Sequence, residues 1–302
     1  MCKSALTKFT LIVIGAAILL PAAAEEVITR VPIWELKSDS ATIYLAGSVH
    51  LLREQDLPIP AAFDEVYALS ERIVFELDME DMMNPATAMA VRRQGMLPEG
   101  ESLSDHFDEE TIKAIKSYAG EMGLPVAILE QMKPGALFIT LTSMAATRHG
   151  ARPDLGIESQ YFQKAQKDNK TTSGLETMAF QMGIFHRISI KTLTRMIHEM
   201  IEKQDESAKA LDDVVAAWKS GDPKQIEEII VSELAEEEEV KKLLLDDRNR
   251  SWIPSIEQAL SGDENVLFIV GAAHLAGEGS VIDLLGKKGY TAKQLSIIPR
   301  LP

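Results

Sequence analysis

The chain has 302 residues, of which 46% are hydrophobic and 25% are charged, and its formal net charge is −15. This length and composition suit one large globular domain or two small ones, with enough apolar material for a sizeable core. The strongly acidic balance argues against nucleic acid and anionic membranes as partners.

The first 24 residues have the pattern of a secretory signal peptide. Lys3 and Lys8 form a positive start, residues 9–20 are almost entirely apolar, and Ala24 ends a run of small residues. This pattern predicts cleavage after Ala24 and a periplasmic or secreted protein. The alternative is an uncleaved anchor, but the apolar run is shorter than the roughly 20 residues of a membrane helix, so no stable membrane span is expected after cleavage.

Cysteine chemistry is excluded from the predicted mature chain, residues 25–302. The single cysteine, Cys2, would leave with the signal peptide, and the loss of Lys3 and Lys8 takes the net charge from −15 to −17. Disulfides, thiolate metal sites and a cysteine nucleophile are therefore not expected. An exported protein without disulfides must be stabilised by its core or by a metal.

The mature chain opens with strand patterns. Residues 31–36 and 42–50 are apolar runs separated by a polar turn, which predicts a hairpin. Residues 61–70 have the spacing of a short amphipathic helix. Residues 72–78 predict a third strand, in which Glu76 interrupts an otherwise apolar centre.

From about residue 80 to residue 260 the spacing of apolar residues is mostly helical. Asp222 and Pro223 give a clear helix start, as N-cap and first helical residue. Residues 170–175 predict one short strand within this region, and the chain closes with a strand over 265–271, a helix over 280–288 and a strand over 290–298. The predicted helices of the middle region cover residues 108–122, 134–146, 159–167, 177–187, 189–203, 206–220, 223–234 and 247–260.

These elements predict a mixed α/β fold. The sheet is expected to be built from both ends of the chain, because the strand patterns lie at the two ends. Residues 25–302 are then one domain, with a mostly helical insertion over about residues 80–260. Two domains in series are not expected.

Two similar units stand out in this pattern. Residues 42–50 and 265–274 each read as a buried strand, stopped by a glycine and followed three residues later by a histidine, His50 or His274. A residue just beyond the carboxyl end of a strand lies where open α/β sheets place their ligand crevice. The repetition indicates two imidazoles at one site, where they could bind a divalent metal ion or act as a general base.

Carboxylates and arginines are the other candidates. Glu76 is either the third metal ligand or general base, or an edge residue facing water, because a carboxylate in an apolar strand is costly to bury unpaired. Glu158 opens a helix, where it could simply complement the helix dipole. Glu176 lies between a short strand and a helix and could face the same crevice. Arg248 and Arg250 could bind a substrate carboxylate or an oxyanion, or form ion pairs on a helix face.

A series of short motifs follows in order along nearly all of the mature chain. They are Trp34, residues 45–50, residues 74–78, residues 156–158, residues 174–177 with Gln181, residues 247–249 and residues 270–275. In these motifs the chain resembles the TraB/PrgY/GumN family, which includes the Tiki metalloproteases.

The resemblance implies a mixed α/β fold related to the erythromycin-esterase-like group, with a metal-dependent site. For Tiki members it implies proteolysis supported by Mn²⁺ or Co²⁺. Carried over to this sequence, it places His50, Glu76 and His274 at metal or catalytic positions and makes Arg248 a site residue. Glu158 stands where an aspartate is common in relatives, which leaves the role of Glu158 open.

The sequence therefore favours an exported metal-dependent hydrolase, in first place a peptidase. His50, Glu76 and His274 would hold Mn²⁺, Co²⁺ or Zn²⁺, and Arg248 would contact the substrate. The expected partner is a peptide or small-molecule substrate, and a homo-oligomer is an option. Two alternatives stay open: a non-catalytic periplasmic protein that binds a peptide or a metal-bearing ligand, and a scaffold on which the histidine pair has no function.

Overall fold

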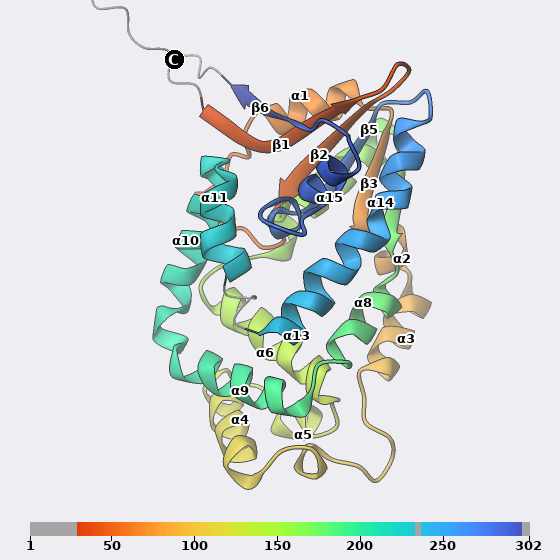
Figure 1. Ribbon diagram of the computed structural model, residues 1–302. Helices are drawn as coiled ribbons and strands as arrows, with labels where there is room; N and C mark the ends of the chain where they lie inside the picture. The colour runs from red at the N-terminus through yellow and green to blue at the C-terminus, as the bar shows by residue number, and fades with distance from the viewer. Residues whose placement is uncertain (1–28, 233–236, 298–302) are drawn as a thin grey trace, which may run out of the picture.

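The computed structural model describes residues 29–232 and 237–297 (Figure 1). The predicted signal peptide, residues 1–24, lies outside the described residues. A β-sheet with helices on both faces forms one end of the molecule, and a cluster of helices forms the other (Figure 1). The prediction of a mixed α/β fold, with a sheet built from both chain ends around a long helical region, is confirmed.

The sheet has six strands in the order β4-β3-β5-β2-β1-β6. β1 pairs antiparallel with β2, which confirms the predicted hairpin, and with β6, while β2, β5, β3 and β4 pair in parallel. β5 comes from the end of the chain, yet it lies between two strands from the beginning. The strands are β1 (Thr29–Lys37), β2 (Thr42–Ser48), β3 (Arg72–Leu77), β4 (Thr171–Glu176), β5 (Val266–Gly271) and β6 (Lys293–Ile297).

Helices cover both faces of the sheet because its central strands are apolar on both sides, as is usual for parallel strands. On one face α1, α7 and α10 bury a core that includes Phe63, Phe162 and Trp218. On the other face α14 and α15 bury a second core with Trp252 and Phe268.

The helical end has its own core, formed by α4, α5, α6, α9 and the turn after α13. No helix in the described part of the chain is both long and apolar enough to cross a membrane. The helices are α1 (Ala62–Leu69), α2 (Met79–Met83), α3 (Pro85–Gln94), α4 (Glu109–Glu121), α5 (Val126–Leu129), α6 (Pro134–Arg148), α7 (Ile157–Asp168), α8 (Met178–Phe185), α9 (Ile190–Glu202), α10 (Ser207–Ser220), α11 (Pro223–Ile226), α13 (Glu238–Lys241), α14 (Asp247–Leu260) and α15 (Val281–Lys287).

One predicted helix differs from the structure. Asp222 caps α11 as predicted, accepting a hydrogen bond from the backbone of Lys224. The predicted single helix over 223–234 instead changes to a π-helical turn at Glu227–Val231, and residues 233–236 lie outside the described residues. A second π-helical turn, Lys242–Asp246, leads into α14. Such turns are rare and often lie at functional sites, and the second one directly precedes Arg248.

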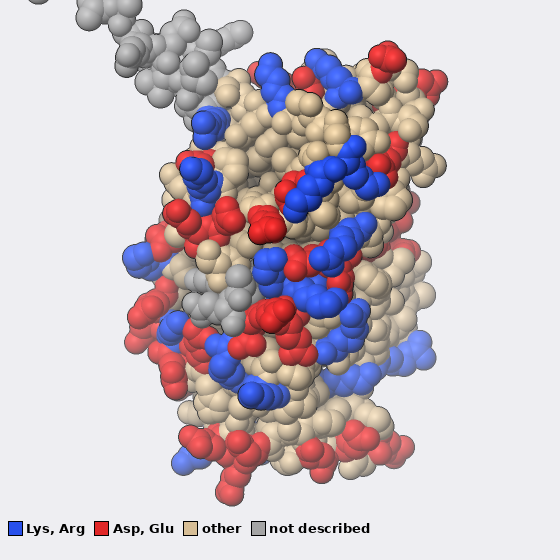
Figure 2. Space-filling model, in the orientation of Figure 1, with Lys and Arg blue, Asp and Glu red and all other residues tan. Residues whose placement is uncertain are grey.

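The surface charge is unevenly distributed. On the face shown in Figure 2, the end formed by α4 and α5 carries mostly acidic side chains, while acidic and basic side chains are interspersed over the middle. The net charge of −15 is therefore not a uniform acidic coat on this face.

Candidate functional site

The three predicted metal ligands lie where strands of the sheet end. His50 follows β2, Glu76 is near the end of β3, and His274 lies in a short 3-10 turn after β5. β5 pairs in parallel with both β2 and β3, so the carboxyl ends of these strands share one edge. The structure thus brings together side chains that are far apart in the sequence.

Gly271 marks the point where they converge. A Cβ atom at this position would lie 3.0 Å from Oε1 of Glu76, 3.5 Å from Cδ2 of His274 and 3.6 Å from Nε2 of His50. The glycine at the end of β5 therefore leaves the space in which these three side chains meet. A larger residue there would push Glu76 away.

His274 is buried and held in one orientation. Its Nδ1 lies 2.6 Å from Oδ1 of Asn249, whose amide nitrogen donates to the carbonyl of Gly279. Nδ1 therefore carries the proton, and Nε2 accepts a hydrogen bond from Arg248 at 3.0 Å. The ring packs on Trp252 with centroids 4.4 Å apart. Burial, and then the charge of Arg248, lower the pKa of His274 to about 3, so the ring is neutral at pH 7.

His50 is held by a carboxylate instead. Its Nδ1 lies 2.8 Å from Oε1 of Glu158, and its side chain is 62% exposed. Glu158, in the first turn of α7, also accepts a hydrogen bond from the hydroxyl of Ser48. α7 can approach this closely because a Cβ at Gly156 would overlap the carbonyl of His50. The Glu158 charge raises the pKa of His50 to about 9.

Glu76 is a buried, paired carboxylate. It is 5% exposed and lies on an interior strand, so the alternative of an edge residue facing water is wrong. It accepts hydrogen bonds from the Gly271 amide at 2.5 Å and from Arg248 at 2.6 Å. Burial alone would raise the pKa of this carboxyl, but His274, Arg248 and the Gly271 amide lower it by more, to well below its ordinary range.

Arg248 connects these groups. It is 7% exposed in the first turn of α14 and donates to Glu176 through Nε, at 3.0 Å, as well as to Glu76. For Arg248 the alternative of an ion-pair array on a helix face is therefore wrong. For Arg250 the ion-pair alternative is correct, because its exposed side chain pairs with Asp247 at 3.2 Å.

Behind Arg248 lies a layer of residues of which sequence reasoning named Glu176 and Gln181 but missed Trp252. Glu176 is buried and accepts hydrogen bonds from Trp252 at 2.8 Å and Gln181 at 3.1 Å, besides that from Arg248. Gln181 also reaches Glu76 at 3.3 Å. Trp252 carried no signal in the sequence, but Glu176 did: it is an acidic residue at the end of a strand neighbouring the one that holds Glu76.

The fit of this site to a divalent ion is mixed. In residues 29–232 and 237–297, no group of three or more His, Cys, Asp or Glu side chains is arranged so that it could hold a metal ion. The guanidinium of Arg248 lies against two of the three candidate donors, Glu76 and His274. The donor chemistry does fit, because His50 and His274 use Nδ1 to bind Glu158 and Asn249, as metal-binding imidazoles usually do.

Comparison with known proteins decides the family. The sequence matches the TraB/PrgY/gumN family over residues 32–294. The chain belongs to this family. The family resemblance inferred from the short motifs is thereby confirmed.

The proteins similar in sequence to this chain include named metalloproteases. The chain is 21% identical to the uncharacterized protein YbaP of Escherichia coli (strain K12) over 242 residues, which cover 80% of this chain and 87% of YbaP. It is 23% identical to metalloprotease TIKI2 of Xenopus tropicalis, covering 82% of this chain and 56% of TIKI2. For human metalloprotease TIKI1 the identity is 21%, over 85% of this chain and 60% of TIKI1. This TraB/PrgY/gumN chain thus spans less than two thirds of the length of these two metalloproteases, and no solved structure matches it.

Proposed function

We propose that this chain is an exported, metal-dependent hydrolase that cleaves peptides. The observation that carries the proposal is the convergence of His50, Glu76 and His274 beside Gly271. The similarity to metalloproteases TIKI1 and TIKI2 supports the reaction class. The signal-like pattern of residues 1–24 supports export.

In this proposal the chain holds Mn²⁺, Co²⁺ or Zn²⁺ through His50, Glu76 and His274. A bound divalent ion polarises a carbonyl group and lowers the pKa of water. Asn249 holds His274 in the tautomer with an unprotonated Nε2. His50, whose pKa Glu158 raises to about 9, would have to lose the proton on Nε2 to bind the ion. As the alternative general base, Glu76 would be weak, because His274, Arg248 and the Gly271 amide keep its pKa well below its ordinary range.

Arg248 has two tasks in the proposal. It forms ion pairs with Glu76 and Glu176. Its contacts with Glu76, Glu176, His274 and the carbonyl of Leu244 use most of its five N–H groups. One N–H on Nη2 remains for an oxygen of the substrate or an oxyanion.

One observation favours a second candidate, a non-catalytic periplasmic protein that binds a peptide or a metal-bearing ligand. The positively charged guanidinium of Arg248 already contacts Glu76 and His274. This contact already satisfies two of the three donors, so a metal ion must displace it. A protein that only binds a ligand would need no such displacement.

Turnover of a peptide library by the purified mature chain tests the proposal. Cleavage is expected with added Mn²⁺, Co²⁺ or Zn²⁺ and is expected to be lost with a chelator. His50→Ala and His274→Ala should each lose the bound metal, measured by elemental analysis, and lose turnover. His149→Ala, at the end of α6 and outside the proposed ligand set, is the control and should behave as the parent.

The result decides between the candidates. Undiminished turnover in the double variant of His50 and His274 would contradict the proposal. Peptide binding without turnover under every metal condition would support the binding protein. An unchanged melting temperature across the metal series would favour a scaffold with an unused histidine pair, because a ligand of the folded state must raise stability.

A further inference from the structure

The outer edge of β4 is unpaired. β4 is the last strand on its side of the sheet and pairs only with β3. Among the described residues, no hydrogen bond is made to the outward N–H and C=O groups of residues 171–175. Such an edge is a ready template for another extended chain.

This edge also lacks the usual protection against pairing. Natural edge strands commonly carry a lysine, a proline or another charge that discourages a second chain. β6, the opposite edge, begins with Lys293. Residues 171–175 of β4 have neither charge nor proline, and the nearby Lys170 is engaged by the carbonyls of Tyr67 and Ser70.

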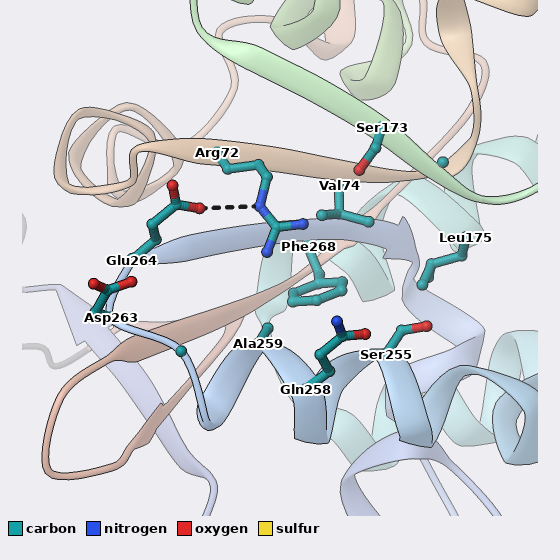
Figure 3. Close-up of a pocket in the computed structure, with 12 residues that line it drawn as sticks. Arg72, Val74, Ser173, Leu175, Ser255, Gln258, Ala259, Asp263, Glu264 and Phe268 are labelled. Carbon is teal, nitrogen blue, oxygen red and sulfur yellow. Dashed lines mark ion pairs between the residues drawn. The ribbon is translucent and has the colours of Figure 1, made fainter.

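A cavity of about 350 Å³ lies beside this edge, between the sheet and the second half of α14 (Figure 3). Its floor is apolar, formed by Val74, Leu175 and Phe268, and Ser255 and Gln258 of α14 face it from the other side (Figure 3). The hydroxyl of Ser255 and the amide of Gln258 have no hydrogen bond to another described residue. Apart from Val74, Leu175 and Phe268 the lining is mainly polar, so the cavity offers hydrogen-bond partners as well as apolar contact.

Arg72 adds donors at one end of the cavity. Its guanidinium points into the space above Phe268, and Nε forms an ion pair with Glu264 at 3.4 Å (Figure 3). That Nε is buried without a hydrogen-bond partner among the described residues. The two Nη groups make no hydrogen bond to another described residue, and backbone carbonyl groups of a bound peptide are acceptors for them.

The edge and the cavity lead to the candidate site. Arg72, Val74 and Glu76 alternate along β3 and so share one face. From Arg72 to Glu76 the strand rises about 13 Å, at roughly 3.3 Å per residue. α14 runs the other way, with Arg248 at the site and Ser255 and Gln258 at the cavity. About four to six residues of extended peptide would reach from the cavity to the site.

We propose that the outer edge of β4 binds an extended segment of the peptide substrate as an added strand, with one side chain of that segment in the cavity beside Arg72. Main-chain hydrogen bonds to the edge would then hold the substrate, and the cavity would select among its side chains. The role in catalysis rests on the proposed function, but the binding itself needs no metal and can be measured without turnover.

The test measures binding in the presence of a chelator. A fluorescein-labelled decapeptide selected from a random library by retention on the full mature chain is titrated by fluorescence anisotropy. Ser255→Trp fills the cavity from an exposed position of α14 and should weaken binding at least about tenfold. Ser261→Trp, exposed at the end of the same helix and outside the cavity, is the matched control and should change binding less than about twofold.

Hydrogen exchange locates the bound peptide. At saturating peptide the amides of residues 171–175 should exchange more slowly, while those of residues 293–297 on the opposite edge should not change. Methylation of the peptide's backbone nitrogens at alternate positions should abolish the protection. Before the titration, circular dichroism checks that the Ser255→Trp and Ser261→Trp variants are folded.

The outcomes separate this inference from the proposed function. Protection of residues 171–175 without turnover under any metal condition supports the docking edge and contradicts the peptidase. Turnover with unchanged exchange at residues 171–175, or equal binding by the Ser255→Trp and Ser261→Trp variants, overturns the docking edge alone. Failure of the library to yield any retained peptide also overturns it.

Discussion

The two strand-glycine-histidine units have the same pattern but opposite surroundings. They are neighbours in the sheet, with Ser48 of β2 opposite Gly271 of β5. The side chain of His50 is 62% exposed and that of His274 only 5%. The pKa of His50 is raised by a carboxylate, whereas burial lowers that of His274. The motif therefore fixes the position of each imidazole, and the helix packed against that imidazole decides whether it is charged.

The largest effect is expected on the buried side, from Arg248→Met. The change leaves the buried carboxylates of Glu76 and Glu176 without a cation. Breaking a buried ion pair from one side costs about 3–5 kcal/mol, which urea unfolding would measure. Arg248→Lys keeps the positive charge but not the planar guanidinium, and should lose less unfolding free energy than Arg248→Met. If Arg248→Met lost no more unfolding free energy than Glu158→Gln, the buried and the exposed histidine surroundings would not differ in their contribution to stability.

Asn249→Ala is expected to cost less. Asn249 is 1% exposed and binds both Nδ1 of His274 and the carbonyl of Gly279. A buried donor left unsatisfied costs about 1–3 kcal/mol, and thermal unfolding would show it. Ser251→Ala, in an exposed position of the same helix, should be nearly neutral. Equal losses for both variants would mean that Asn249 does not orient the imidazole.

Glu158→Gln should act mainly on protonation. Without the carboxylate, the pKa of His50 is expected to fall from about 9 towards the ordinary value of about 6.5, as measured by NMR titration of the chelated protein. A raised folded-state pKa stabilises the fold below the unfolded pKa, and this is lost as the pH rises through the folded one. The stability gap between parent and variant should therefore be widest below about pH 6.5 and close above about pH 9. Because His50 is largely exposed, the gap should not exceed about 1 kcal/mol.

The smallest effect is expected from Ser48→Ala. This change removes only the hydroxyl that donates to Glu158 and leaves the pair with His50 in place. The expected loss is about 0.5 kcal/mol, with the pKa of His50 still raised in the same titration. A pKa as low as in the Glu158→Gln variant would show that Ser48 positions the carboxylate, not merely supports it.

Much of this arrangement could be predicted from local sequence. Strand patterns ending in Gly47 and Gly271 predicted two histidines at one edge, and the interrupted strand predicted Glu76 beside them. Local periodicity suffices here because each signal lies within one element. The helix start at Asp222 was found for the same reason.

The partners of these residues could not be predicted in the same way. Glu158 was as well explained by the helix dipole as by a contact with His50, because that contact depends on how α7 packs against the loop after β2. The alternative of a surface ion-pair array for Arg248 could not be dismissed from the sequence, because its buried partners Glu76 and Glu176 come from two other elements, β3 and β4. Such contacts are set by tertiary packing, which leaves no periodic trace in the sequence.

The place of β5 in the sheet has a consequence for synthesis. Ile43 pairs with Val266, so the centre of the sheet needs the start and the end of the chain together. A nascent chain that has not yet reached residue 266 leaves facing edges of β2 and β3 without their shared neighbour and lacks His274 altogether. Such distant pairings form slowly and late. The candidate site therefore cannot assemble on the ribosome until almost the whole polypeptide has emerged, which delays any reaction it performs until translation is nearly complete.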